Sequence, residues 1–210
     1  MEKRLYLYPV WIRLWHTLNA VLVIILIFTG ISMQYASAEL SFSLIRFDQA
    51  VAWHNVAAII LVFNYVIFVL GNIFTGNSRH YKVKKENFWS RLFTQLKFYA
   101  FGMFKGEEHP FPVSYKQKFN PLQKISYVLV MYVGMPVVII TGFGLLFPEI
   151  LVQQFFGVSG LLITDVLHIT MGFIITIFLV IHIYTCTLGD KPGTLFKSMI
   201  NGYHEEHEEH

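Results

Sequence analysis

Four long apolar stretches constrain this chain more than any other feature of its sequence. They cover about residues 12–35, 48–75, 122–147 and 161–188. A helix needs roughly 20 apolar residues to cross the hydrocarbon core of a membrane, so each stretch is long enough to span it. Only 14% of the residues are charged, whereas soluble domains usually carry about a quarter. The sequence therefore predicts an all-α integral membrane protein, a bundle of four transmembrane helices.

The distribution of Lys and Arg predicts how these spans are oriented. All but one of the 16 Lys and Arg residues lie near the N-terminus, between the second and third spans, or in the C-terminal tail; the exception is Arg46. Positive residues accumulate in cytoplasmic connections. We therefore expect both termini, a loop over about residues 76–121 and the tail over residues 189–210 to be cytoplasmic. Residues 1–210 are expected to form a single membrane domain.

The N-terminal part of the chain also has features of a secretory signal peptide. A basic start precedes the apolar stretch, and residues 36–38 resemble a cleavage site. However, the apolar stretch is longer than that of a signal peptide, and Arg13 and His16 interrupt its beginning. We expect this segment to be retained as the first span.

Within the long loop, apolar residues recur at helical spacing. They are Phe88, Trp89, Leu92, Phe93, Leu96, Tyr99 and Met103. This pattern is typical of an amphipathic helix that lies in the membrane interface. An amphipathic helix that simply covers the bundle is the alternative interpretation.

The C-terminal tail ends in alternating histidines and glutamates, His204 to His210. We expect this tail to be solvated and disordered, with metal binding as the alternative. Nothing in the sequence indicates nucleic-acid binding, and we expect no nucleic-acid partner.

Four histidines lie inside the expected spans: His16, His54, His168 and His182. Ionisable residues within spans are unfavourable there and tend to be functional. His168 and His182 are separated by about 21 Å along one helix axis, and their side chains point within about 40° of each other. The predicted topology places His54 with His168 near the outer surface, and His16 with His182 near the inner surface.

Two separated pairs of imidazoles predict two haem groups. Neutral imidazole is a strong axial ligand for haem iron, and facing helices of a bundle commonly hold cofactors. A bare zinc ion would need four ligands clustered in one place. The chain has one cysteine, Cys186, and no C-x-x-C-H motif, so the haems are expected to be of the non-covalent b type.

Other residues near the histidines have candidate roles. Arg13, one turn before His16, could pair with a haem propionate, or it could simply anchor the span on the cytoplasmic side. Small residues such as Gly30 and Gly172 could make room for flat macrocycles, or they could serve helix packing.

Several segments resemble a known family. Residues 8–16 resemble the first-helix motif of the dihaem cytochrome b family, which includes the membrane subunits of nickel-iron hydrogenases, formate dehydrogenases and thiosulfate reductases. Trp53-His54-Asn55 resembles the second-helix ligand segment of that family. His168 and His182 repeat its pair of ligands on the fourth helix, 14 residues apart. The resemblance covers nearly the whole chain.

Residues 104–107 and 118–124 look closest to the thiosulfate-reductase-type branch. The resemblance implies a quinone site near the inner haem, for menaquinone or ubiquinone. Asn120 and Gln123 stand at the matching positions and could hydrogen-bond a quinone carbonyl. The alternative is that Asn120 caps the helix that begins at Pro121.

The expected function is electron transfer, and no residue of this chain is expected to be catalytic. A periplasmic iron-sulfur or multihaem subunit would exchange electrons with the outer haem, and a quinone would meet the inner haem. The expected location is the cytoplasmic membrane of a bacterium or archaeon, and electrons could flow in either direction. Two alternatives stay open: a self-contained superoxide:quinone oxidoreductase resembling bacterial cytochrome b561, and a haem-free membrane anchor.

Overall fold

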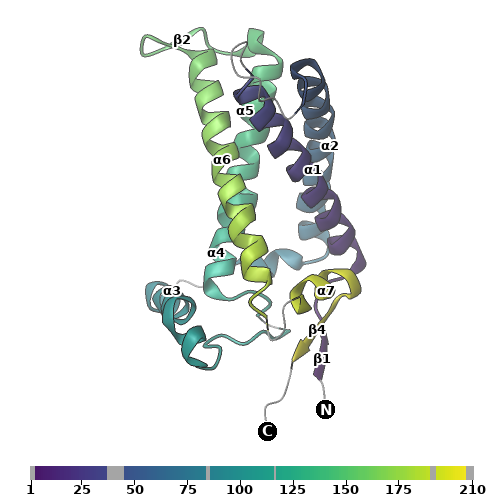
Figure 1. The fold of residues 1–210 in the computed structure, drawn as a ribbon, viewed down its shortest axis with the longest axis vertical. Coiled ribbons are helices and arrows are strands. Elements are labelled where there is room, and N and C mark those ends of the chain that lie inside the picture. Colours follow the sequence, from purple (N-terminus) through teal and green to yellow (C-terminus); the bar gives the residue numbers. More distant parts are fainter. Residues whose placement is uncertain (1–2, 37–44, 84–85, 116, 190–192, 207–210) are drawn as a thin grey trace. The chain divides into compact units, whose positions relative to one another are not determined.

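The computed structural model describes residues 3–36, 45–83, 86–115, 117–189 and 193–206. Four helices coincide with the four expected spans to within about two residues at each end (Figure 1). Each is long and apolar enough to cross a membrane. They are α1 (Val10–Gln34), α2 (Phe47–Phe74), the helix Pro121–Leu146, and α6 (Gly160–Cys186). The protein is therefore an all-α integral membrane protein, as the sequence predicts.

The third span is not uniform along its length. It consists of α4 (Pro121–Leu129), a π-helical turn (Val130–Gly134) and α5 (Met135–Leu146). Single π-turns inside α-helices are often found at functional sites.

By its contacts the chain forms two compact units, and each is described by itself. Unit 1 comprises Met1–Tyr8, Gly71–Met135 and Ile181–His210. Unit 2 comprises Pro9–Leu70 and Pro136–Val180. The single membrane domain expected from the sequence stays a prediction.

In unit 2, α1 packs antiparallel against α2. The indole N–H of Trp15 donates to the backbone carbonyl of Asn64 at 2.9 Å. The Trp15 ring also stacks on Phe68, with the ring centroids 4.5 Å apart. Toward the other end of the pair, Thr29 on α1 contacts His54 on α2. These contacts fix how far α1 is shifted along α2.

The second helix pair of unit 2 is formed by α5 and α6. A 3₁₀ turn (Pro148–Ile150) and a short antiparallel hairpin, β2 (Gln154–Phe155) with β3 (Val158–Ser159), connect the two helices. Large apolar side chains of α6 are exposed, including Phe173 at 65% and Val180 at 64%. Such exposure suits a lipid environment, where apolar side chains gain little by being buried.

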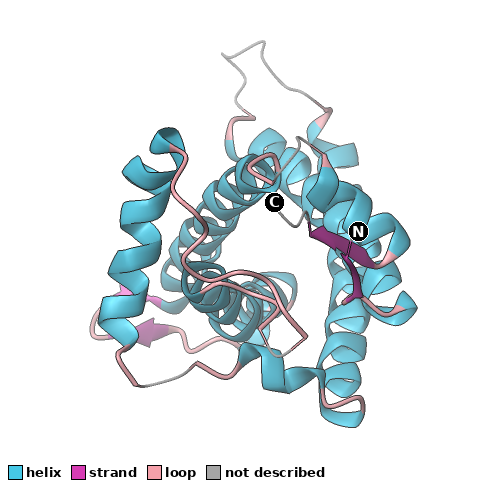
Figure 2. Ribbon diagram, turned by 90° about the horizontal axis from the view of Figure 1, so that it is seen from below, coloured by secondary structure: helices cyan, strands magenta, loops and turns pink. Residues whose placement is uncertain are grey.

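Unit 1 holds a two-stranded pairing that the sequence did not predict. Strand β1 (Lys3–Tyr6) pairs antiparallel with β4 (Tyr203–Glu206), which follows α7 (Thr194–Asn201) (Figure 2). Gly202, at φ +87°, joins α7 to β4, and its carbonyl accepts the N–H groups of Leu7 and Tyr8. A Cβ at Gly202 would lie 2.7 Å from the carbonyl oxygen of Tyr8, so only glycine fits.

The prediction of a disordered tail was therefore wrong for residues 204–206. The ladder of backbone hydrogen bonds between β1 and β4 outweighs the low strand propensity of charged residues. The rest of the tail, residues 207–210, lies outside the described residues.

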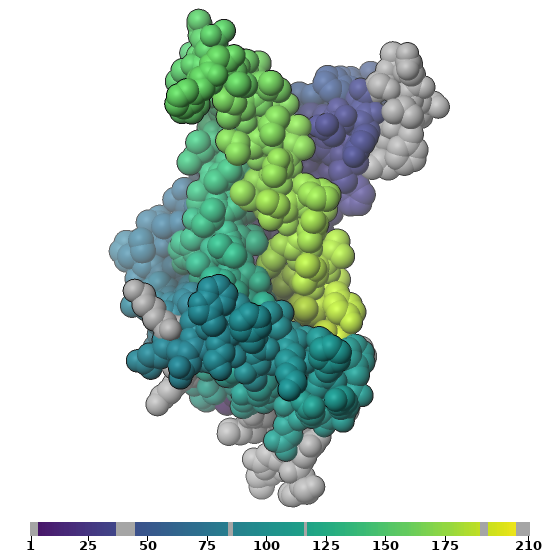
Figure 3. All heavy atoms as spheres, turned by 90° about the vertical axis from the view of Figure 1, so that its left-hand side faces the viewer, coloured from purple at the N-terminus to yellow at the C-terminus, as the bar shows by residue number. Residues whose placement is uncertain are grey.

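Helix α3 (Phe88–Lys97) lies on the outside of unit 1 (Figure 3). A π-helical turn (Phe98–Gly102) and a 3₁₀ turn (Met103–Lys105) extend it. Trp89 and Phe93 of this helix are exposed, at 67% and 63%, whereas Gln95 is only 1% exposed. Exposed aromatic side chains suit a helix that lies in the membrane interface, and this placement stays a prediction.

We expect reporter fusions to verify the predicted orientation, because the positive residues lie on one side of the spans. Alkaline phosphatase, which is active only outside the cytoplasm, should be active when it is inserted in the β2–β3 hairpin. The same enzyme fused after Gly202 should be inactive. A phosphatase active at both positions, or only after Gly202, would contradict the orientation.

Candidate functional site

Two of the four span histidines face each other within unit 2. His54 lies near the start of α2, and His168 lies in the first half of α6. Their ring centroids are 6.2 Å apart, and the ring planes are inclined by 67°. Both side chains are half-buried. The structure thus brings together the outer histidine pair (His54 and His168) that the sequence predicts.

Each ring of the outer pair contacts a threonine hydroxyl on the neighbouring helix. Thr29 Oγ1 on α1 lies 2.9 Å from Nδ1 of His54. Thr141 Oγ1 on α5 lies 2.9 Å from Nδ1 of His168. Both threonines are buried, at 1% and 8% exposure. Sequence reasoning missed these two residues.

A glycine follows each of these threonines, and each glycine borders the same ring. A Cβ built on Gly30 would lie 3.6 Å from Cε1 of His54, and one built on Gly142 would lie 3.4 Å from Cε1 of His168. The backbones of α1 and α5 therefore approach the ring edges closely. The repeated Thr-Gly pair was the signal in the sequence that could have led to all four residues. Gly172, in contrast, has nothing within 4 Å of a built Cβ.

The two other span histidines belong to different units. His16 lies on α1 in unit 2, directly after Trp15. His182 lies on α6 in unit 1, where its ring meets the Tyr127 ring edge-on at 5.8 Å between centroids. Their pairing as an inner histidine pair (His16 and His182) stays a prediction. So does a haem-propionate role for Arg13, whose side chain is half-buried.

Asn120 and Gln123 form a capping box at the start of α4. The Asn120 side chain accepts the backbone N–H of Gln123 at 2.8 Å, and the Gln123 side chain accepts the backbone N–H of Asn120 at 3.2 Å. The amide of Asn120 also donates to the hydroxyl of Tyr99 at 2.9 Å. Burial raises the pKa of the Tyr99 hydroxyl. The capping interpretation of Asn120 is thus confirmed, and a quinone role for either residue stays a prediction.

Positive charge is concentrated in unit 1 outside the spans. Burial lowers the pKa of Lys118 to about 8, and Arg79 shifts it in the same direction. Burial also lowers the pKa of His80 to about 4, helped by the charges of Lys118, Arg79 and Lys124. His80 is therefore neutral at neutral pH. The Lys118 ammonium lies 5.8 Å from the centre of the Tyr8 ring.

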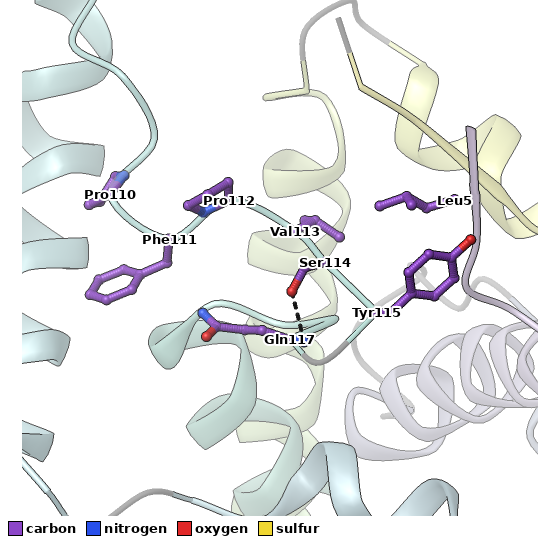
Figure 4. A pocket seen from close by; sticks show the side chains of 8 residues that line it. All are labelled: Leu5, Pro110, Phe111, Pro112, Val113, Ser114, Tyr115 and Gln117. Carbon is purple, nitrogen blue, oxygen red and sulfur yellow. Dashed lines mark hydrogen bonds between the residues drawn. The ribbon is translucent and has the colours of Figure 1, made fainter. Parts of the chain in front are cut away.

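A hollow of about 410 Å³ lies in unit 1 between Leu5 and residues 110–115 and 117 (Figure 4). Phe111, Pro112 and Val113 supply much of its apolar lining. Its polar groups include Ser114, whose hydroxyl oxygen accepts the backbone N–H of Gln117 at 3.2 Å. None of the predicted site residues lines it.

Comparison with known proteins identifies the family of this chain and its type of cofactor. A model of the family described as "Prokaryotic cytochrome b561" matches residues 7–202. The chain belongs to this family. It is therefore a multi-pass membrane cytochrome that carries b-type haem, and the haem-free anchor is set aside.

Two relatives extend this comparison. A protein of Escherichia coli (strain K12) described as a cytochrome, YdhU, is 37% identical over 96% of this chain and 75% of its own length. A protein of Cupriavidus necator described as a B-type cytochrome subunit of a nickel-iron hydrogenase is 27% identical over 96% of this chain and 87% of its own length. No solved structure matches the chain.

The outer histidine pair fits a haem by its chemistry and its spacing. Two metal–nitrogen bonds of about 2.0 Å, plus about 1.2 Å from each nitrogen to its ring centre, place the centres of two imidazoles on one metal about 6.4 Å apart. The observed separation of 6.2 Å agrees with that value. Because Nδ1 of each ring contacts a threonine, Nε2 is the nitrogen left to bind a metal. Among the described residues, no three His, Cys, Asp or Glu side chains are grouped to hold a bare ion.

We expect His54→Ala and His168→Ala each to remove one low-spin haem b from the purified protein, because each change leaves that haem with a single axial ligand. The haem content is measured from the pyridine haemochrome spectrum per mole of protein. His109→Ala is the matched control, because that ring packs on Phe98 in unit 1 and should leave the haem content unchanged. A full haem complement in His54→Ala would contradict the assignment.

Proposed function

We propose that this chain carries electrons across the membrane through two b-type haems, one held by His54 and His168 and the other by His16 and His182. The observation that carries the proposal is the outer pair of facing imidazoles, 6.2 Å apart. Membership of the cytochrome b561 family supports the cofactor type. The proposal extends this to a second haem and to named ligands.

At the outer site, the residues of the chain hold and orient two imidazoles. A haem held there by His54 and His168 would supply a one-electron couple. Thr29 and Thr141 prevent rotation of the rings, and their burial keeps water from the Nδ1 atoms. Fixed ligands minimise the rearrangement that accompanies electron transfer.

At the inner site, α6 supplies a second ligand. The helix runs from Gly160 to Cys186 and includes both His168 and His182. A separation of 14 residues corresponds to about 21 Å along its axis, which suits two sites at two depths of the membrane. His16 on α1 is the proposed partner of His182.

The proposed quinone site lies at the cytoplasmic end of α4. Tyr99 accepts a hydrogen bond from Asn120, so its own O–H can donate to a carbonyl of menaquinone or ubiquinone. The capping box of Asn120 and Gln123 fixes the backbone at this point. Tyr127 lies next to His182 on the same unit, which supports electron exchange between a quinone held here and the inner site.

The proposed partner is a periplasmic iron-sulfur or multihaem subunit. One relative is described as the cytochrome subunit of a hydrogenase, so a catalytic partner suits this family. The connections on the proposed outer side cover only about residues 36–46 and 147–159, which is too short for a catalytic domain. The proposed location is the cytoplasmic membrane of a prokaryote. The direction of electron flow then follows from the relative potentials of the partner and the quinone.

A redox titration of the purified protein tests the two-haem proposal. We expect two one-electron components in the wild type, and one component in His16→Ala and in His182→Ala. The remaining component should keep the potential of the outer haem, because its ligands are untouched. Both variants should also lose reduction of the haem by a quinol analogue, since the proposed quinone site lies beside the inner haem.

His54→Ala is the matched comparison, because it should remove the other component. A single component in the wild type would refute the second haem. Two components in His16→Ala would refute the inner pairing and leave the outer site standing.

A further inference from the structure

The two rings of the outer histidine pair are held in the same way, although they lie on different helices. In each case a Thr-Gly pair on the preceding helix meets the ring: Thr29 contacts Nδ1 of His54, and Thr141 contacts Nδ1 of His168. Both contacts measure 2.9 Å. The pairs α1–α2 and α5–α6 thus repeat one local arrangement around the site.

The second contact of each threonine decides which atom donates the hydrogen bond. Thr29 Oγ1 lies 2.7 Å from the backbone carbonyl of Ile25, and Thr141 Oγ1 lies 2.7 Å from that of Val137. A carbonyl oxygen only accepts, and a hydroxyl has one hydrogen to give. Both distances are typical of a good O–H···O bond. The hydroxyl hydrogen therefore points to the carbonyl, and Oγ1 presents its lone pairs to the imidazole.

The protonation of the rings follows. If Oγ1 accepts, Nδ1 of each histidine carries the hydrogen and donates it. In a neutral imidazole the other nitrogen, Nε2, is then without a hydrogen and can bind a metal. The same bond fixes the rotation of the ring, and the threonine is itself fixed, because its bond to the carbonyl one turn back selects its side-chain rotamer.

We propose that Thr29 and Thr141 are the positioning residues of the outer haem site, each accepting a hydrogen bond from Nδ1–H of its histidine and so setting the haem potential. This rests on the proposed function, in which His54 and His168 bind that haem. A hydrogen bond accepted from Nδ1–H increases the electron donation of Nε2, because it shifts negative charge onto the ring. Stronger donation stabilises ferric over ferrous iron, so the two threonines lower the potential of the outer haem.

The test compares Thr29→Val and Thr141→Val with the corresponding serine variants in the complete protein. Valine keeps the shape and removes the acceptor, whereas serine keeps the acceptor and removes the methyl group. We expect each valine variant to raise the potential of the outer haem alone, by up to about 59 mV, equivalent to a tenfold change for a one-electron couple. The serine variants should have the wild-type potential. The double valine variant should raise the potential of the outer haem by the sum of the two single shifts.

A second readout is the electron paramagnetic resonance spectrum of the ferric protein. The signal of the outer haem should change in the valine variants, because the ring orientation is no longer fixed. Thr176→Val is the matched control, because the Thr176 hydroxyl donates to the carbonyl of Gly172 on the same helix, at 2.8 Å. This control should leave both potentials and both signals unchanged.

The outcomes separate this inference from the function on which it rests. Valine variants that keep both haems at wild-type potentials would overturn it. So would serine variants that shift as much as the valine ones, because the shift would then not depend on the hydrogen-bond acceptor. If a valine variant does not fold, Thr29→Ala and Thr141→Ala carry the same expectation. A full haem content in His54→Ala would instead refute the proposed site itself.

Discussion

The structure depends on placing two imidazoles opposite each other inside an apolar environment. Polar groups within a membrane are unfavourable unless they are bonded, so both nitrogens of each ring need a partner. Thr29 and Thr141 provide one partner per ring from the helix alongside. Their hydroxyl hydrogens are in turn satisfied by carbonyls of the same helix. In the proposed haem site, the remaining nitrogen of each ring binds the iron.

This requirement explains how the helices of unit 2 are positioned. The Trp15–Asn64 and Trp15–Phe68 contacts fix α1 along α2, and this brings Thr29 to the level of His54. The glycine after each threonine borders the same ring, because a Cβ built on it would lie at contact distance from Cε1 of the histidine. Because lipid gives no hydrophobic force between helices, such close packing and interhelical hydrogen bonds are the main sources of specificity.

Hydropathy and helical period were enough to predict the spans and the approach of His54 to His168. Both signals are local: a run of about 20 apolar residues defines a span, and a 14-residue separation returns a side chain to the same face of a helix. Thr29 and Thr141 were missed because a threonine in a span usually bonds its own helix, as Thr176 does. A threonine that also contacts a histidine can be recognised only from the position of the neighbouring helix. A single sequence does not contain that position.

The β1–β4 pair was missed for a related reason. Its strands are four residues each, come from the two ends of the chain and carry charges that strands usually disfavour. Their pairing depends on Gly202, whose carbonyl binds the backbone at Leu7 and Tyr8 just before α1 begins. Asn120 shows the opposite case, because capping was one of two roles that the local sequence itself suggested.

The repeated Thr-Gly arrangement makes the two sides of the outer histidine pair equivalent. α1–α2 and α5–α6 each supply one histidine, one hydroxyl and one glycine, so neither helix pair can hold a haem between two imidazoles alone. Two equivalent halves meeting at one iron would give it two ligands of nearly equal donor strength. Two ligands of equal donor strength would hold the iron equally from both sides. The iron would then move little when its oxidation state changes. A site that only passes electrons needs this property more than it needs reactivity.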